Sequence, residues 1–209
     1  MYKRFLKRLL DIIISLLMII GLSWLLIIIG VIIKLTTKER VFYCQKRIGK
    51  NKNEFLILKF RTMKTSAPGD VPTHLLQNSN QYITSIGKFL RKTSLDELPQ
   101  LFNIFIGTMS LVGPRPALWN QYDLIEERDK YKANTVRPGL TGWAQVNGRD
   151  ELPIPLKAQY DGEYIKRMSI SFDIFCIFKT FSCVLKSEGI REGSNEVKKL
   201  YEESTGNWS

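Results

Sequence analysis

The chain has 209 residues, which is enough for a domain with a hydrophobic core of its own. It carries 31 Lys and Arg against 20 Asp and Glu, a formal net charge of +11. That excess favours polyanionic partners such as nucleic acid, anionic lipid headgroups or phosphorylated substrates, although it also serves solubility. The three cysteines, Cys44, Cys176 and Cys183, are odd in number and lack a CxxC spacing, which argues against a disulfide framework and a zinc site.

The first predicted element is an apolar helix over residues 12–35, which follows the basic residues Lys3, Arg4, Lys7 and Arg8. At 1.5 Å per residue such a helix reaches about 36 Å, the thickness of a bilayer. Basic residues flank both ends, so the positive-inside rule selects no orientation. Gly and Ser within residues 21–24 can bend the helix. A straight span and a segment that returns to the same face are both open.

The polar part of the chain predicts an α+β fold, rich in helices and with a small β-hairpin. Residues 41–45 and 55–63 are β-prone and enclose a turn, and alternation places Lys59 and Arg61 on one face. Solvated strand charges are the simpler interpretation of that pair. The loop over residues 65–80 holds the only histidine, His74, a weak candidate for catalysis.

Hydrophobic periodicity predicts several helices and one buried strand after this loop. The predicted helices cover residues 82–92, 95–106, 117–134, 156–168 and 169–188, and the strand covers residues 109–112. The last helix holds so many aromatic and aliphatic residues that it suits either a core helix or an amphipathic helix in a membrane interface.

An adjacent acidic pair, Asp96 and Glu97, follows the basic pair Arg91 and Lys92. Ser94 and Glu97 fit the S-x-x-E capping box, which would make the acids structural. Asp96 is not needed for that box, and a carboxylate at a positive helix end stays ionised, as a nucleophile or a metal ligand must. Capping and catalysis are both open.

Two further segments carry candidate ligands for an anion. Arg115 stands between two prolines, which hold the backbone rigid and suit recognition of phosphate, although a structural turn is the alternative. The glycine-rich segment 137–150 adds the donors Arg137, Gln145, Asn147 and Arg149, without the pattern of a phosphate-binding loop.

Taken in order, the sequence motifs resemble those of the small monotopic bacterial phosphoglycosyl transferases, the bacterial sugar transferase family. The resemblance covers almost the whole chain. The motifs are KRLLD before the apolar run, KFRTM at 59–63, RKTSLDELPQLFN at 91–103, MSLVGPRP at 109–116 and RPGLTGWAQVNGR at 137–149. The family starts capsule, exopolysaccharide and glycoprotein glycans on undecaprenyl phosphate.

The resemblance implies a reaction in two steps. Asp96 matches the nucleophile that attacks the β-phosphate of a UDP-sugar, so that UMP leaves and a sugar-phosphate stays on the aspartate. Undecaprenyl phosphate then attacks this adduct. Glu97 matches the ligand of a required Mg²⁺. The candidates for binding substrate phosphates are Lys59, Arg61, Arg91, Arg115 and Arg137, and the candidates in the substrate-binding loop are Gln145, Asn147 and Arg149.

The resemblance also implies a place in the cell, the bacterial cytoplasmic membrane, with the catalytic domain on the cytoplasmic face. Residues 1–35 would form a re-entrant membrane helix, residues 36–190 the catalytic domain and residues 191–209 a polar tail. The family commonly breaks the helix at Ser-Pro, where this chain has Ser23 and Trp24, so the kink imposed by proline is missing. Membrane lipid is an implied partner, and downstream glycosyltransferases are candidate partners.

Three other functions compete with this interpretation. A membrane-anchored scaffold would use the acids only as caps, and a phosphohydrolase would use water in place of the lipid acceptor. Nucleic-acid binding is disfavoured because the aromatic residues lie in apolar runs, away from the basic residues. The motifs do not name the sugar.

Overall fold

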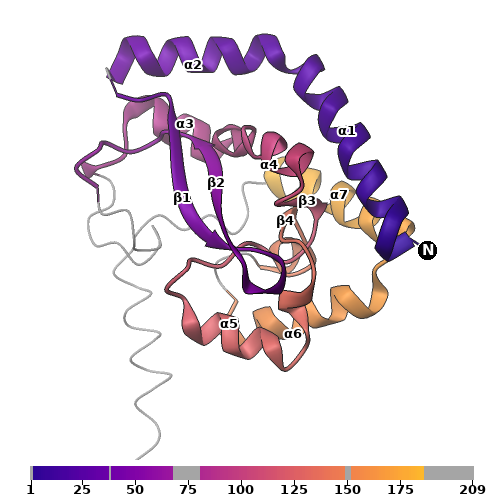
Figure 1. Ribbon diagram of the computed structural model, residues 1–209. Helices are drawn as coiled ribbons and strands as arrows, with labels where there is room; N and C mark the ends of the chain where they lie inside the picture. Colours follow the sequence, from indigo (N-terminus) through magenta and orange to yellow (C-terminus); the bar gives the residue numbers. More distant parts are fainter. Residues whose placement is uncertain (1, 38, 68–80, 149–151, 186–209) are drawn as a thin grey trace, which may run out of the picture.

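The computed structural model describes residues 2–37, 39–67, 81–148 and 152–185. It has the predicted α+β fold, with helices around two small sheets (Figure 1). Three predictions fall outside the described residues: His74, Arg149 and the tail 191–209.

Helices and strands follow one another in a mixed order. The helices are α1 (Lys7–Gly21), α2 (Ser23–Thr37), α3 (Ser85–Lys92), α4 (Gln100–Ile106), α5 (Tyr122–Asp129), α6 (Ile154–Arg167) and α7 (Ile170–Leu185). The strands are β1 (Phe42–Ile48), β2 (Glu54–Phe60), β3 (Ser110–Val112) and β4 (Gly139–Thr141). The predicted hairpin is confirmed by the antiparallel pair β1–β2, in which Phe42 lies opposite Phe60. The predicted buried strand is β3, which pairs in parallel with β4.

The apolar N-terminal run forms two helices, α1 and α2, which meet at an angle of 60°. Leu22 lies at the break, and its N–H still donates to the Met18 carbonyl over 2.9 Å. Ser23 Oγ donates to the Ile20 carbonyl over 2.8 Å, the back-bonding that bends helices. In the described part of the chain no single helix is long and apolar enough to cross a membrane; only this bent pair satisfies both criteria together.

Each half of the bent pair packs on a different part of the domain, and together they form an arc along one edge (Figure 1). Met18 and Ile19 of α1 contact the main core, which is built around α4, β3, α6 and α7. Ile29 and Ile33 of α2 are buried with Phe60 and Leu90, from β2 and α3. The bend therefore lets one apolar run cover two separate parts of the core.

Polar side chains anchor the first turns of α1 to the domain. Lys7 Nζ forms a largely buried ion pair with Asp173 of α7, at 2.6 Å, and Tyr2 donates to the same carboxylate. The buried Asp11 accepts the Leu111 N–H of β3 over 3.0 Å. Tyr164 joins this group by donating to Asp173 Oδ1 over 2.8 Å. These contacts hold α1 against β3 and α7.

The predicted capping box at Ser94 is wrong. Ser94 has φ 57° and its side chain makes no capping bond, while Glu97 is held by cations elsewhere. The segment predicted as one helix over residues 95–106 is a 3₁₀ turn, Leu95–Glu97, followed by α4. Pro99 lacks an N–H, and the bonds around it run over three residues, as from Leu101 N to Leu98 O. The acid pair thus lies on a tight turn that precedes α4 and is not part of that helix.

The helix predicted over residues 117–134 is shorter, with α5 beginning at Tyr122. Helical periodicity predicts that Leu118, Tyr122 and Ile125 share an apolar face, yet the Tyr122 side chain is 62% exposed. Arg128 of α5 is buried and pairs with the buried Asp161 of α6 at 2.6 Å. The two last predicted helices are confirmed as α6 and α7. The cysteines are all free, with Cys176 buried in the core.

The parallel pair β3–β4 depends on glycines that let two backbones meet. A Cβ placed on Gly139 would lie 2.1 Å from the Gly113 nitrogen, and one on Gly142 would lie 2.0 Å from the Gly113 carbonyl oxygen. Both contacts are far shorter than van der Waals distances, and the atoms that they involve belong to the backbone. No side chain rotation can relieve them.

We expect Gly139→Ala to separate β3 from β4 and to lower the free energy of unfolding by more than about 3 kcal/mol, because backbone must move to admit the methyl group. The thermal midpoint of the purified chain in detergent measures this. Gly21→Ala is the matched control, since nothing lies within 4 Å of its Cβ position. It should be neutral or slightly stabilising. Equal midpoints for both variants would contradict the close approach.

Candidate active site

A cavity of about 790 Å³ lies beside the acidic pair, within the size range of small-molecule sites. The charged residues of its lining come from β2, α3, the 3₁₀ turn and the segments after β2 and β3, and many of its apolar residues come from α1, β3, β4 and α7. The charged residues include Lys59, Arg61, Arg91, Asp96, Glu97 and Arg115; the apolar residues include Ile14, Met18, Leu111, Leu140, Ile177 and Phe181.

Glu97 is held between two cations at the polar end of this cavity. Lys59 Nζ lies 2.6 Å and Arg115 Nη2 lies 2.9 Å from the same carboxylate oxygen, Oε1. Burial alone would raise the pKa of Glu97, but the charges and hydrogen bonds of Arg115 and Lys59 outweigh it and hold the pKa well below its usual range. Glu97 is therefore ionised throughout the physiological range.

Asp96 lies next to this ion pair, and its side chain is nearly buried. Removal from water raises its pKa to about 6, and the negative charge of Glu97 acts in the same direction. Lys59, Arg91 and Arg115 oppose the rise. Two neighbouring carboxylates therefore differ in character: Glu97 is paired, whereas Asp96 carries a poorly solvated charge at neutral pH. Such a carboxylate is more basic than an ordinary aspartate.

The cavity brings together most of the residues predicted for the site. Arg61 lines it while its Nε donates to the Arg40 carbonyl over 3.0 Å. Gln145 also lines it, and its Oε1 is buried without a hydrogen-bond partner in the described part of the chain. An acceptor of this kind requires a donor, since leaving it unpaired costs free energy. A ligand bearing an N–H or O–H group would supply one.

Two predicted residues lie elsewhere. Arg137 does not line this cavity; its Nε donates to the Gly107 carbonyl over 2.8 Å, behind β3. Asn147 is occupied by structural contacts, since its Nδ2 donates to the Trp143 carbonyl and its Oδ1 accepts from Lys179 over 2.7 Å. Residues that are close together within the segment 137–150 thus do not all line the same cavity.

The cavity also contains polar residues that were not predicted for the site, among them Gln121, Arg128 and Lys157. Arg128 Nε donates to Asp161 Oδ2 over 2.8 Å, and the two residues are 33 positions apart in the chain. No local pattern in a single sequence relates residues at that separation. An amphipathic pattern places charged residues on the solvent-facing side of a helix, so the pattern of α5 does not predict that Arg128 is buried.

Among the described residues no group of three or more His, Cys, Asp or Glu side chains could hold a metal ion by itself. Mg²⁺ does not require such a group, because it is commonly bound by one or two carboxylates together with substrate phosphates and water. Asp96 and Glu97 are the acids that line the cavity. The residues present therefore fit a Mg²⁺ ion that arrives with a diphosphate, and they do not form a complete protein site.

Comparison with known proteins places the chain in a family. Residues 2–187 match the model of the family described as "Bacterial sugar transferase". The chain belongs to this bacterial sugar transferase family. It is 34% identical over 197 residues to the exopolysaccharide production protein ExoY of Sinorhizobium fredii, an alignment that covers 88% of this chain and 87% of ExoY.

Other relatives are longer than this chain. It is 40% identical over 185 residues to the UDP-glucose:undecaprenyl-phosphate glucose-1-phosphate transferase of Escherichia coli. The alignment covers 85% of this chain and 39% of that protein. It is 36% identical over 196 residues to a UDP-N-acetylgalactosamine-undecaprenyl-phosphate N-acetylgalactosaminephosphotransferase of Aeromonas hydrophila, covering 90% of this chain and 45% of that protein. The chain spans less than half of these two relatives.

The opposite pKa shifts of the two acids predict opposite effects on stability. Folded Asp96 keeps its proton up to about pH 6, whereas unfolded Asp96 loses it near 3.8. Ionisation of Asp96 therefore costs stability as the pH rises through this interval. At pH 7.5 we expect Asp96→Asn to raise the free energy of unfolding by up to about 3 kcal/mol, and at pH 4 the gain should vanish. Thermal unfolding at the two pH values measures both.

Glu97→Gln is the companion variant and should behave in the reverse way. The folded pKa of Glu97 is lowered, so its ion pairs stabilise the fold above the unfolded pKa and are lost only in acid. The variant should unfold more easily than the wild type at pH 7.5, with a smaller difference at pH 4. A shift of both variants in the same direction at pH 7.5 would show that the environments of the two acids are not as described.

Proposed function

We propose that the protein transfers a sugar-1-phosphate from a UDP-sugar to undecaprenyl phosphate and releases UMP, as a first membrane step in the synthesis of exopolysaccharide or a related glycan. The observation that carries the proposal is the cavity, in which Asp96 and Glu97 lie among Lys59, Arg91 and Arg115. Cations facing a carboxylate pair suit the meeting of that pair with a diphosphate. The undecaprenyl-phosphate sugar phosphotransferases among the relatives support the same chemistry.

The proposed reaction has two displacements at one phosphorus atom. A carboxylate oxygen of Asp96 bonds to the β-phosphorus, and the bond from that phosphorus to the bridging oxygen breaks, so that UMP leaves with the electron pair. A phosphate oxygen of undecaprenyl phosphate then bonds to the same phosphorus, and Asp96 leaves as a carboxylate. The raised basicity of Asp96 suits it to the first step. The product is undecaprenyl-diphospho-sugar.

The charged residues make these displacements feasible, because a carboxylate and a diphosphate repel each other. Lys59 and Arg115 are already placed within 3 Å of the Glu97 carboxylate, beside Asp96. They and Arg91 would cancel phosphate charge in this poorly solvated space. Gln145, with its unpaired Oε1, would accept a hydrogen bond from the donor substrate. In this proposal Arg61 also contacts substrate phosphate.

The proposal includes a Mg²⁺ ion, which Glu97 and the diphosphate of the substrate would bind together. When bound, the ion supplies positive charge to the phosphate oxygens and to the departing UMP. Glu97 can take this part because it stays ionised at all physiological pH values. Lys59 and Arg115 orient its carboxylate.

The apolar residues that line the cavity suit a lipid acceptor, and they suit a location of the protein at the bacterial cytoplasmic membrane. Large apolar side chains are exposed on both N-terminal helices and on α7: Leu17, Ile20, Trp24, Ile27, Phe178 and Phe181 are all at least 60% exposed. Exposed apolar area of this extent is costly in water, which supports the proposal of a membrane contact. In this proposal α1 and α2 form a re-entrant pair, and the acidic pair faces the cytoplasm, where UDP-sugars occur.

We expect Asp96→Asn to abolish both UMP release and the formation of a covalent adduct, because an amide cannot act as the nucleophile. Glu97→Gln should weaken the dependence on Mg²⁺ and the activity together. The assay follows UMP release from a panel of UDP-sugars with purified protein in detergent, with and without undecaprenyl phosphate. Intact mass measurement detects the sugar-phosphate adduct.

Lys88→Gln serves as the control, since this exposed lysine lies on α3 outside the cavity and its loss should leave turnover unchanged. Steady UMP release without the lipid would indicate hydrolysis, with water as the acceptor. Near-normal turnover by Asp96→Asn would exclude the aspartyl intermediate, and an inactive wild type with every sugar would favour a scaffold.

A further inference from the structure

A second cavity lies on the opposite side of β3 from the acidic pair. Its volume is about 120 Å³, well below that of pockets that hold a drug-sized ligand. Ser110 and Val112 line this cavity, whereas Leu111 lines the larger one. Alternate residues of a strand point to opposite faces. The three residues of β3 therefore form a wall between two separate cavities.

The lining of this second cavity is strongly basic. It includes Lys3, Lys7, Arg8, Lys50 and Arg137, with Asp11 as the acid among the lining residues. The Lys7 amine is already paired with Asp173, and the Asp11 carboxylate accepts the Leu111 N–H. The remaining cations outnumber the acid, so the cavity has a positive charge that its own lining does not balance. Gathering like charges costs free energy unless an anion joins them.

Two of the arginines have a structural task at the end of α4. Arg8 donates to the Ile104 and Phe105 carbonyls over 2.6 and 2.7 Å, and Arg137 Nε donates to the Gly107 carbonyl. Cations are favourable at the negative end of a helix. This interaction explains the position of the Arg8 guanidinium and of the Nε edge of the Arg137 guanidinium. Within the described chain the two terminal nitrogens of Arg137 make no hydrogen bond, so its fork of donors is only partly used.

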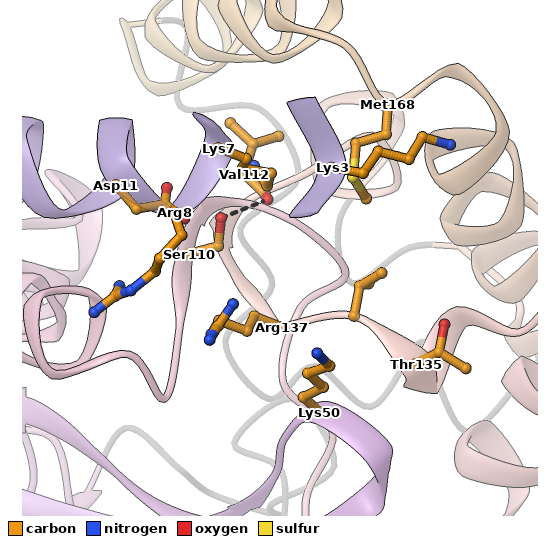
Figure 2. Close-up of a pocket in the computed structure, with 11 residues that line it drawn as sticks. Lys3, Lys7, Arg8, Asp11, Lys50, Ser110, Val112, Thr135, Arg137 and Met168 are labelled. Atoms are coloured by element: carbon orange, nitrogen blue, oxygen red, sulfur yellow. Dashed lines mark hydrogen bonds between the residues drawn. The ribbon is translucent and has the colours of Figure 1, made fainter. Parts of the chain in front are cut away.

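Lys50 has no such structural explanation. It comes from the turn between β1 and β2, and its amine has no partner among the residues that the structure describes. Figure 2 shows the Lys50 and Arg137 side chains entering the same space, with the Arg137 guanidinium extended toward Arg8. Cations from distant parts of the chain thus line one small cavity, in which Asp11 is the acid among the lining residues. This is the arrangement expected where an oxyanion binds.

We propose that the second cavity binds a phosphate group, held chiefly by Arg137 and Lys50. A phosphate fits the size of the cavity and would use the bidentate donors that Arg137 has left. Its source is either the headgroup of a phospholipid, since α1 continues directly into the apolar run, or a phosphate free in solution. Because the lining comes from α1, the hairpin turn and the segment 135–137, an occupied site would also fasten these three parts together.

Lys50→Glu tests the proposal, since it places a carboxylate beside Arg137 and should repel phosphate. Lys88→Glu is the matched control: it is exposed, makes the same charge change and lies outside both cavities. The full chain is purified in detergent and stripped of lipid. Its thermal midpoint is then titrated with inorganic phosphate, with sodium chloride at equal ionic strength as the reference. Native mass spectrometry counts the phospholipids retained before stripping.

We expect Lys50→Glu to bind phosphate at least about tenfold more weakly than either the wild type or Lys88→Glu. Fewer retained phospholipids in Lys50→Glu would identify a headgroup as the source. Weaker stabilisation by phosphate with unchanged lipid retention would identify a free phosphate. Should charge reversal prevent folding, Lys50→Gln is measured in the same way. Equal phosphate binding and equal lipid retention for the Lys50 and Lys88 variants would overturn the proposal.

Discussion

Two neighbouring carboxylates in a poorly solvated space are the constraint on which the larger cavity depends. Asp96 and Glu97 cannot both be buried and ionised unless positive charge is brought to them. Lys59 comes from β2, Arg91 from α3 and Arg115 from the loop after β3, so three separate elements must meet at the 3₁₀ turn. This single electrostatic requirement links the position of the hairpin, the direction of α3 and the course of the chain after β3.

The small sheet β3–β4 turns this requirement into a fixed geometry. Gly113 approaches Gly139 and Gly142 so closely that the loop carrying Arg115 is pressed against β4. From the other side, Asp11 accepts the Leu111 N–H and joins α1 to the same strand. A strand of three residues therefore fixes the relative positions of the apolar helix α1, the loop that carries Arg115 and the two cavities.

Local sequence patterns predicted the elements whose cause is local. The hairpin follows from alternation and turn residues, and the late helices follow from periodic apolar residues. The start of α4 could not be predicted this way, because Ser94 and Glu97 satisfy a capping motif while tertiary ion pairs take the Glu97 carboxylate instead. The grouping of Lys59, Arg91 and Arg115 with the acidic pair came from the family resemblance. The Arg128–Asp161 pair and the position of Arg137 depend on long-range packing, which no short motif records.

The bend between α1 and α2 has a consequence that comes from its chemistry. A proline would remove an N–H and its ring would clash with the preceding turn, whereas the residue after Ser23 here is Trp24, which imposes neither constraint. The helical bonds from Leu22 to Met18 and from Leu26 to Leu22 are kept across the break. The 60° angle is stabilised by Ile29 and Ile33 against Phe60 and Leu90. The angle thus has a local source, the bond from Ser23 to the Ile20 carbonyl, and a tertiary one, the packing of α2 on β2 and α3.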